Sequence, residues 1–536
     1  MNTRRTGGIL LHPTSLPGRF GIGDLGPQAH SFVDWLADSG CRLWQVLPLG
    51  PTGHGNSPYQ CHSVFAGNAY LISPEILLRD RLLTEADLRT APHLDPKPGE
   101  STCRVDFGRV IPWKLSLLKT AYARFKRTAS GALAAEFSRF RSENAPWLDD
   151  FSLFMALKEK YGGLSWTRWP APIRERRMEA LDQARRALKH AALRCSFSQM
   201  LFFRQWTELR NHTAQLGVRL IGDVPIFAAL DSSDVWAHPE LFRLDDARLP
   251  TVVAGVPPDY FAPTGQLWGN PLYRWEYHRQ SGYAWWLARL RATLALVDIV
   301  RLDHFRGFAG YWEIPADAAT AEAGKWMPGP AESFLDVVVQ ALRGDPSSEH
   351  LPLIAEDLGV ITQDVIRLVQ RYDLPGMRLL QFAFSGRHPD FLPDNYSENC
   401  VAYTGTHDND TARGWYATAP ELERQAALQY LHSNQETIVR DMIHAVWASR
   451  AMFAIVPIQD LLELGTEARM NYPGKPEGYW EWRLGADDLT DSLAERLRTL
   501  NTECGRSAHD WGAARGPGWS IPGEHFSAKD PLNLGP

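Results

Sequence analysis

Eight short apolar segments recur along the sequence, and each ends in polar residues or in glycine and proline. They contain many residues that are favoured in β-strands, and amphipathic helical stretches separate several of them. Nearly continuous apolar runs are typical of parallel strands that are covered on both faces. The pattern therefore predicts an α/β fold, a (β/α)8 TIM barrel. The eight segments are 7–15, 43–51, 218–227, 296–305, 351–360, 377–384, 401–410 and 453–462.

The chain has 536 residues, whereas a barrel of this kind needs only about 250. We therefore expect a single catalytic barrel over residues 1–536 with large helical and loop insertions between its strands. Residues 63–216, between the second and third strands, are expected to form a mainly helical insertion. Residues 228–275, after the third strand, are rich in proline, glycine and aromatic residues and are expected to form long loops. Helices are predicted in the first insertion at 113–128, 131–143, 150–161, 174–193 and 196–216.

Charged residues follow several of these predicted strands directly. In the stretch VRLDHFRGF (300–308), Arg301 and Asp303 share one strand face with the apolar Ile299. Other strands end with Asp223, Glu356, and the pair His407 and Asp408. The active site of a barrel lies at the carboxyl ends of its strands. An acid after a strand is often a helix cap or a turn residue, but four strands that end this way together favour a shared site.

Some polar residues near these positions have a simpler interpretation. His304, Arg306 and Asp357 lie off the inward strand faces or beyond them, so we expect them to be structural partners. His12 and His62 could be ligands, but we expect them to be hydrogen-bonded structural histidines.

No motif for a metal or an organic cofactor is present. The sequence lacks HExxH, GxSxG and the phosphate-binding GxxxxGK[ST], and its six cysteines form no CxxC pair. We therefore expect no metal and no cofactor, and chemistry that carboxylates perform. The cysteine spacing is typical of reduced thiols in the cytoplasm.

Charge and hydropathy exclude two classes of partner. With a net charge of −6 and no basic cluster, the chain has no electrostatic field to hold nucleic acid. It has no apolar segment near the ~18 residues of a membrane span, and its N-terminal apolar run is too short for a signal peptide. We expect a cytoplasmic protein with neither nucleic acid nor membrane as a partner.

Aromatic residues in two segments indicate the class of substrate. SPYQ (57–60) follows the second strand, and 255–275 contains Tyr260, Phe261 and Trp268. Aromatic rings beside carboxylates and amides suit sugars, whose C–H faces pack on rings while their hydroxyls take hydrogen bonds. Alone, such a segment is more often local packing. Beside a carboxylate cluster, it favours a carbohydrate.

Several motifs together resemble one family. GDVPIF (222–227), VRLDHFRGF (300–308), IAEDLGV (354–360) and YTGTHDND (403–410) resemble the four conserved regions of the amylase clan. With SPYQ, AGVPPDYF (254–261), GQLWGNPLYRW (265–275), LPGMRLLQFAF (374–384) and EARMNYPG (467–474), the chain resembles the 4-alpha-glucanotransferases. These enzymes, also called amylomaltases or disproportionating enzymes, form glycoside hydrolase family 77. The resemblance runs from about residue 7 to 485 and is densest after 220.

The resemblance implies an activity and a set of roles. Such enzymes move segments of a 1,4-alpha-glucan to the 4-hydroxyl of an acceptor glucose or glucan by a retaining mechanism through a covalent glycosyl-enzyme. It implies Asp303 as nucleophile, Glu356 as general acid and base, and Asp408 as a third carboxylate that holds sugar hydroxyls. The implied substrates are maltooligosaccharides, amylose and glycogen-derived glucans, with glucose as an acceptor. The implied substrate-binding residues are Ser57, Tyr59, Asp223, Tyr260, Trp268, Arg301 and His407.

Two other functions remain open at this point. An amylase-type hydrolase has the same acids, and an inactive glucan-binding protein could share the barrel. The presence of every catalytic carboxylate argues against the inactive protein. The chain has His54 where some relatives have tyrosine, a departure that concerns an outer glucan contact and not the catalytic residues.

Overall fold

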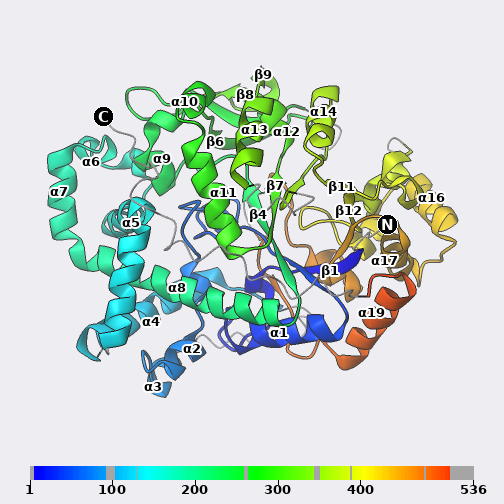
Figure 1. Cartoon of the computed structure of the whole chain (residues 1–536), viewed down its shortest axis with the longest axis horizontal. Coiled ribbons are helices and arrows are strands. Elements are labelled where there is room, and N and C mark those ends of the chain that lie inside the picture. The colour runs from blue at the N-terminus through cyan, green and yellow to red at the C-terminus, as the bar shows by residue number, and fades with distance from the viewer. Residues whose placement is uncertain are drawn as a thin grey trace.

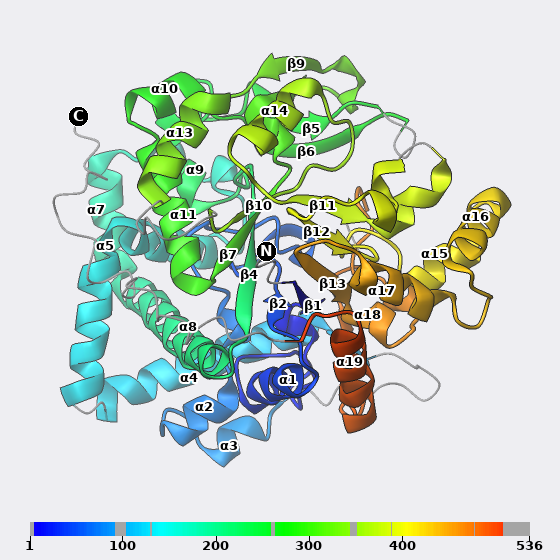
Figure 2. The ribbon, with the colours of Figure 1, turned by 45° about the vertical axis from the view of Figure 1, so that its right-hand side comes forward.

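The computed structural model describes residues 5–91, 103–128, 131–258, 263–342, 351–386, 389–475 and 478–507. Its central feature is a sheet of eight parallel strands in the order β10-β7-β4-β2-β1-β13-β12-β11 (Figures 1 and 2). The two end strands meet where the amide of Ala355 donates to the carbonyl oxygen of Pro375 at 2.9 Å. The predicted (β/α)8 barrel is confirmed, and each predicted segment overlaps one of its strands. The strands are β1 (Thr6–Leu10), β2 (Leu43–Gln45), β4 (Arg219–Pro225), β7 (Ile299–Asp303), β10 (Leu353–Ala355), β11 (Gly376–Leu379), β12 (Cys400–Tyr403) and β13 (Phe453–Pro457).

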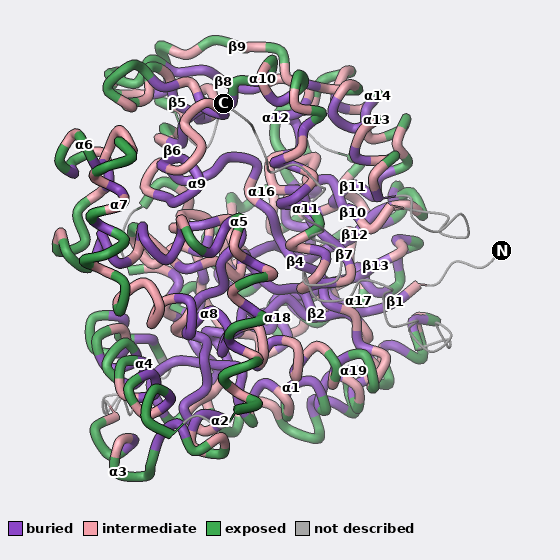
Figure 3. The backbone as a smooth tube through the Cα atoms, turned by 60° about the vertical axis from the view of Figure 1, so that its left-hand side comes forward, coloured by how far each residue is buried: buried purple, intermediate pink, exposed green. Residues whose placement is uncertain are grey.

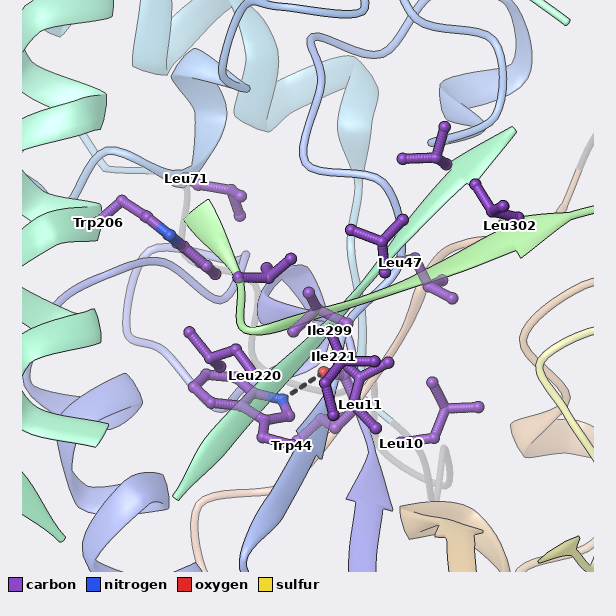
Figure 4. Close-up of a cluster of buried hydrophobic side chains, with 14 of the residues drawn as sticks. Leu10, Leu11, Trp44, Leu47, Leu71, Trp206, Leu220, Ile221, Ile299 and Leu302 are labelled. Atoms are coloured by element: carbon purple, nitrogen blue, oxygen red, sulfur yellow. Dashed lines mark hydrogen bonds between the residues drawn. The ribbon is translucent and has the colours of Figure 1, made fainter. Parts of the chain in front are cut away.

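Buried apolar side chains fill the space within and around these strands, and the strands are buried along almost their whole length (Figure 3). Trp44 of β2, fully buried, donates its indole N–H to the carbonyl oxygen of Leu11 at 2.7 Å (Figure 4). Leu220 and Ile221 of β4 and Ile299 of β7 lie in the same cluster. Burial on both faces explains why the strands appear in the sequence as nearly continuous apolar runs.

Helices surround the barrel (Figure 1). Those outside residues 63–216 are α1 (Pro27–Asp38), α9 (Ser233–Ala237), α10 (Trp275–Gln280), α11 (Ala284–Leu296), α12 (Arg306–Ala309), α13 (Ala331–Leu342), α14 (Gln363–Arg371), α15 (Ala412–Thr418), α16 (Glu421–Leu431), α17 (Ile438–Ala448), α18 (Ile458–Leu461) and α19 (Asp491–Glu503). Among the described residues, no helix has both the length and the hydrophobicity that a bilayer crossing requires.

Residues 63–216 contribute α2 (Pro74–Arg79), α3 (Glu85–Leu88), α4 (Phe107–Thr128), α5 (Gly131–Lys160), α6 (Ala171–Arg174), α7 (Met178–Ala187) and α8 (Lys189–Gln215). The predicted helices 131–143 and 150–161 are one helix, α5, which continues through Pro146. Buried polar contacts tie this layer to the loop after β2. The Gln199 amide, for example, accepts from the Gly67 N–H at 2.7 Å and donates to its carbonyl oxygen at 2.9 Å. Lys158 of α5 lies 2.6 Å from Asp231, in the segment after β4.

A four-stranded antiparallel sheet, here called the accessory sheet, lies beyond β10 and β11 at the top of Figure 2. Its order is β6-β5-β8-β9, with β5 (Val252–Val256), β6 (Gln266–Pro271), β8 (Gly310–Pro315) and β9 (Lys325–Pro328). The expectation of long loops over 228–275 is therefore wrong, because α9, β5 and β6 lie there. Glycine interrupts the apolar pattern of β5 for a steric reason, since a Cβ on Gly255 would lie 2.2 Å from the Gln266 carbonyl oxygen. A further small antiparallel pair joins β3 (Cys103–Arg104) to β14 (Trp482–Arg483).

Candidate active site

Arg301 connects three carboxylates at the carboxyl ends of β4, β7 and β10. One guanidinium nitrogen (Nη1) lies 2.6 Å from Asp223 Oδ2 and 2.9 Å from Asp303 Oδ1. The other (Nη2) lies 3.4 Å from Glu356 Oε2. The register of the sheet produces this meeting, because Arg301 lies level with Asp223 on one side and with Ile354 on the other. One buried cation thus contacts all three acids.

Burial favours the protonated form of Glu356. Burial raises the pKa of Glu356 well above its usual range, and the neighbouring Asp303 carboxylate raises it further. Arg301 and the backbone N–H of His304, which donates to Glu356 Oε2, act in the opposite direction. Asp303 is more exposed than Glu356, and its Oδ1 accepts a hydrogen bond from Arg301 at 2.9 Å. The pair therefore has the charge asymmetry that an acid and a nucleophile require.

Tyr59, Asp223 and His407 form a layer beside this centre. The Tyr59 hydroxyl donates to Asp223 Oδ2 at 2.7 Å, and the Tyr59 ring stacks on His407 with centroids 5.2 Å apart. Burial raises the pKa of Asp223 to about 7, and burial lowers the pKa of His407. Asp223 Oδ1 and His407 Nδ1 have no hydrogen-bond partner among the described residues. Both side chains therefore retain hydrogen-bonding capacity beside the centre.

Asp408 lies on the loop after β12 and is held by the segment 469–474. Asn471 donates its side-chain amide to Asp408 Oδ1 at 2.7 Å, and Arg469 donates to the Asp408 carbonyl oxygen at 2.7 Å. His407 Nε2 lies 3.4 Å from the same carboxylate. Sequence reasoning did not select Asn471 as a site residue, although it lies within the motif EARMNYPG. That motif was the available signal, but its contact with Asp408 depends on the tertiary fold.

A cavity of about 560 Å³ opens over these residues. The sequence-predicted residues that line it are Ser57, Tyr59, Trp268, Arg301, Asp303, Glu356 and Asp408. Asp223 and His407 instead line two smaller adjoining pockets of about 70 and 30 Å³. Tyr260, with Phe261, lies outside the described residues.

Residues expected to be only structural also border the cavity. His304 and Arg306 both line it, and the His304 ring meets Trp268 edge to face with centroids 4.8 Å apart. Burial lowers the pKa of His304 to about 3, so its ring is neutral. His12 and His62 behave differently from each other. His62 Nδ1 lies 2.8 Å from the Asp231 carbonyl oxygen, as a structural histidine would, whereas Nδ1 of the buried His12 has no partner among the described residues.

Trp268 also differs from expectation in its location. It lies on strand β6 of the accessory sheet, and its indole N–H donates to Gln266 Oε1 at 3.1 Å. Its position at the cavity is therefore fixed by a strand rather than by a loop. Within the described ranges, no group of three or more His, Cys, Asp or Glu residues is arranged to hold a metal ion.

Known proteins that are similar to this chain identify its family. The family model described as 4-alpha-glucanotransferase matches residues 11–488. The 4-alpha-glucanotransferase of Thermus thermophilus is 48% identical over 93% of this chain and 99% of its own length. The protein of the same name from Synechocystis is 46% identical over 94% of this chain and 99% of its own. The solved structure of amylomaltase from Streptococcus agalactiae in complex with acarbose has a TM-score of 0.89 and 36% identity, and it covers 94% of this chain and 100% of that one. The chain therefore belongs to the 4-alpha-glucanotransferase family, whose members are glycosyltransferase-type enzymes.

Proposed function

We propose that the protein carries out its 4-alpha-glucanotransferase reaction by a retaining double displacement through a covalent glycosyl-enzyme. Maltooligosaccharides, amylose and glycogen-derived 1,4-alpha-glucans are the donors, and glucose or a glucan is the acceptor. The observation that carries this proposal is that Asp303 and Glu356 lie together around Arg301 at the cavity, with the pKa of Glu356 raised well above its usual range by burial.

In the first half of the reaction, the Asp303 carboxylate attacks the anomeric carbon of the donor sugar. Glu356, protonated because burial raises its pKa, gives its proton to the glycosidic oxygen as the bond to the leaving sugar breaks. The product is an ester between Asp303 and the donor segment.

In the second half, the Glu356 carboxylate takes the proton of the acceptor 4-hydroxyl. The hydroxyl oxygen attacks the anomeric carbon and releases Asp303, so the configuration is inverted twice and therefore retained. Glu356 ends protonated, as it began.

The remaining contacts position the sugars. Asp408, held by Asn471, is placed to accept hydrogen bonds from hydroxyls of the reacting sugar. Ser57, Tyr59, Asp223, Arg301 and His407 form the donor side. Trp268, whose ring meets that of His304 at the cavity, covers the acceptor side, and we assign Tyr260 to the same side on the basis of the family resemblance.

Incubation with maltotriose as the only substrate tests this function. A transferase yields glucose together with a ladder of longer maltooligosaccharides, because each donor segment is passed to another sugar. A ladder that persists in the presence of a chelator supports the expected independence from metal. Products that are only shorter than maltotriose would indicate an amylase-type hydrolase, and tight glucan binding without any product would indicate an inactive binding protein.

Trp268→Ala is expected to raise the ratio of hydrolysis to transfer. If Trp268 covers the acceptor side, its loss admits water to the glycosyl-enzyme and weakens the hold on the acceptor. New reducing ends and ladder products measured in one maltotriose reaction give the ratio. An unchanged ratio with a lowered melting temperature would show that Trp268 only stabilises the accessory sheet.

We also propose that the protein acts in the cytoplasm without a nucleic-acid or membrane partner. The support is the spacing of the six cysteines, which is typical of reduced thiols, and the net charge of −6 without a basic cluster. Fractionation of cells with a tagged chain tests the location directly. Recovery with the membrane or secreted fraction would contradict it.

A further inference from the structure

Two of the side chains at the cavity, Arg306 and Trp326, have no part in the mechanism above. Both border the cavity. Trp326 lies on β9, the edge strand of the accessory sheet farthest from β6, and is 42% exposed. The two edge strands of one sheet thus bring two tryptophans to the same cavity, Trp268 from β6 and Trp326 from β9.

Two neighbours hold Trp326 in place, and each of them is itself anchored by a hydrogen bond. The guanidinium carbon of Arg306 lies 3.8 Å from the centre of the Trp326 ring, and Arg306 itself donates to the carbonyl oxygen of Val360 at 2.7 Å. Trp312 of β8 is the cross-strand partner of Trp326, with ring centroids 5.1 Å apart. The Trp312 indole N–H in turn donates to the Ala321 carbonyl oxygen at 2.9 Å. An exposed ring that is already fixed loses little conformational entropy when it binds a ligand.

The position of Arg306 and Trp326 in the chain indicates on which side of the cavity they lie. The segment that leads to Arg306 is attached to the general acid, because the His304 N–H donates to the Glu356 carboxylate and the Phe305 N–H donates to the Glu356 carbonyl oxygen at 3.2 Å. Val360, the acceptor of Arg306, follows Glu356 by four residues. Glu356 protonates the oxygen of the leaving sugar and later deprotonates the acceptor. Its neighbours therefore lie on the leaving-group and acceptor side.

We propose that Trp326 and Arg306 form an outer acceptor subsite, which binds a glucose unit of an alpha-glucan beyond the unit that reacts. The C–H face of the sugar packs on the indole, and Arg306 offers N–H donors to the sugar hydroxyls. The subsite determines acceptor length. It raises the affinity of the enzyme for acceptors of several glucose units and adds nothing to the binding of free glucose. This inference rests on the proposed mechanism.

The test uses isotopically labelled α-maltosyl fluoride as donor, because fluoride leaves without occupying the acceptor side. Transfer of the label to glucose or to maltotriose is measured at several acceptor concentrations. For Trp326→Ala, the ratio of kcat/KM for maltotriose to kcat/KM for glucose should fall about threefold to tenfold, as expected for the loss of an aromatic contact. The fall should come from a higher KM for maltotriose. Trp326→Phe should restore part of the ratio.

Leu267→Ala is the matched control. Leu267 has nearly the same exposure, 43%, and lies in the same sheet on β6, but it does not border the cavity. In Leu267→Ala, the ratio of kcat/KM for maltotriose to kcat/KM for glucose should equal that of the wild type. A fall of both rates in equal proportion in Trp326→Ala, or an unchanged ratio, would overturn the subsite. Failure of the wild-type enzyme to transfer the label to either acceptor would instead contradict the proposed function.

Discussion

Asp303→Asn is expected to lower transfer from maltotriose by at least the ~10²–10⁴-fold that loss of a general acid or base typically costs. The amide keeps the shape of the side chain and can still contact Arg301, so the fold should remain intact, but it cannot form the covalent ester. Glu356→Gln and Asp408→Asn should also lower transfer by orders of magnitude. Initial rates of ladder formation measure the loss, and circular dichroism checks the fold. Asp317→Asn, at an exposed position, is the control for loss of one negative charge.

Two further substrates separate the roles of the acids. α-Maltosyl fluoride needs no proton for its leaving group, so Glu356→Gln should still form the glycosyl-enzyme from it while failing with maltotriose. In Asp303→Gly, azide can occupy the vacated space and attack the anomeric carbon, which releases fluoride and gives the β-glycosyl azide. Retention of more than about a tenth of wild-type turnover by Asp303→Asn would be far outside the range for a nucleophile or acid. The assignment of Asp303 would then be wrong.

Arg301→Met is expected to give the largest loss of stability of any substitution in the site, in addition to loss of transfer. Removal of one partner from a buried ion pair typically costs about 3–5 kcal/mol. Here one guanidinium contacts three carboxylates, and its side chain is only 3% exposed. The midpoint of urea unfolding measures the loss. Lys114→Met is the control, because Lys114 is equally buried but pairs with one acid, Asp24, at 3.0 Å.

The loss of stability in Arg301→Met should grow as the pH rises. Arg301 lowers the pKa of Asp223 and of Glu356, both of which burial raises, so its removal moves both values further up. Unfolded Asp and Glu have pKa values of about 3.9 and 4.3. The folded variant therefore binds more protons than its unfolded chain above that range, and its free energy of unfolding falls as the pH rises. The difference in the free energy of unfolding between wild type and Arg301→Met should be larger at pH 8 than at pH 5. An equal difference at both values would show that Arg301 acts by packing rather than by charge.

The barrel was predictable because each of its strands can be recognised from residues that are adjacent in the sequence. Each strand is a short apolar run that ends in a turn, and the two-residue period places Arg301 and Asp303 on the face of Ile299. The same period in parallel strands at one register brings Asp223 and Glu356 to Arg301. No single acid identified the site, since any one of them could be a helix cap, but their shared position at the strand ends did.

The accessory sheet was not predictable in the same way. Strand β5 pairs with β8, about 60 residues later, and the glycine that this close pairing requires appears in the sequence as a loop residue. Trp326 lies outside every strand, insertion and motif that the sequence indicates, because nothing next to it in the sequence suggests Arg306 as a partner. Asn471 is likewise 63 residues from Asp408. Contacts of this kind depend on the complete fold, so sequence periodicity does not contain them.

The pairing of β1 with β13 has a consequence for biosynthesis. Thr6 lies level with Phe453, so one edge of the first strand gains its neighbour only after most of the chain exists. At the usual elongation rate of about 5–20 residues per second, the ribosome needs roughly 20–90 s to reach that point. During this time the nascent β1 has a free edge, and free strand edges promote association between chains. Nascent chains that are released early, before residue 453, are therefore the ones most exposed to aggregation and most dependent on chaperones.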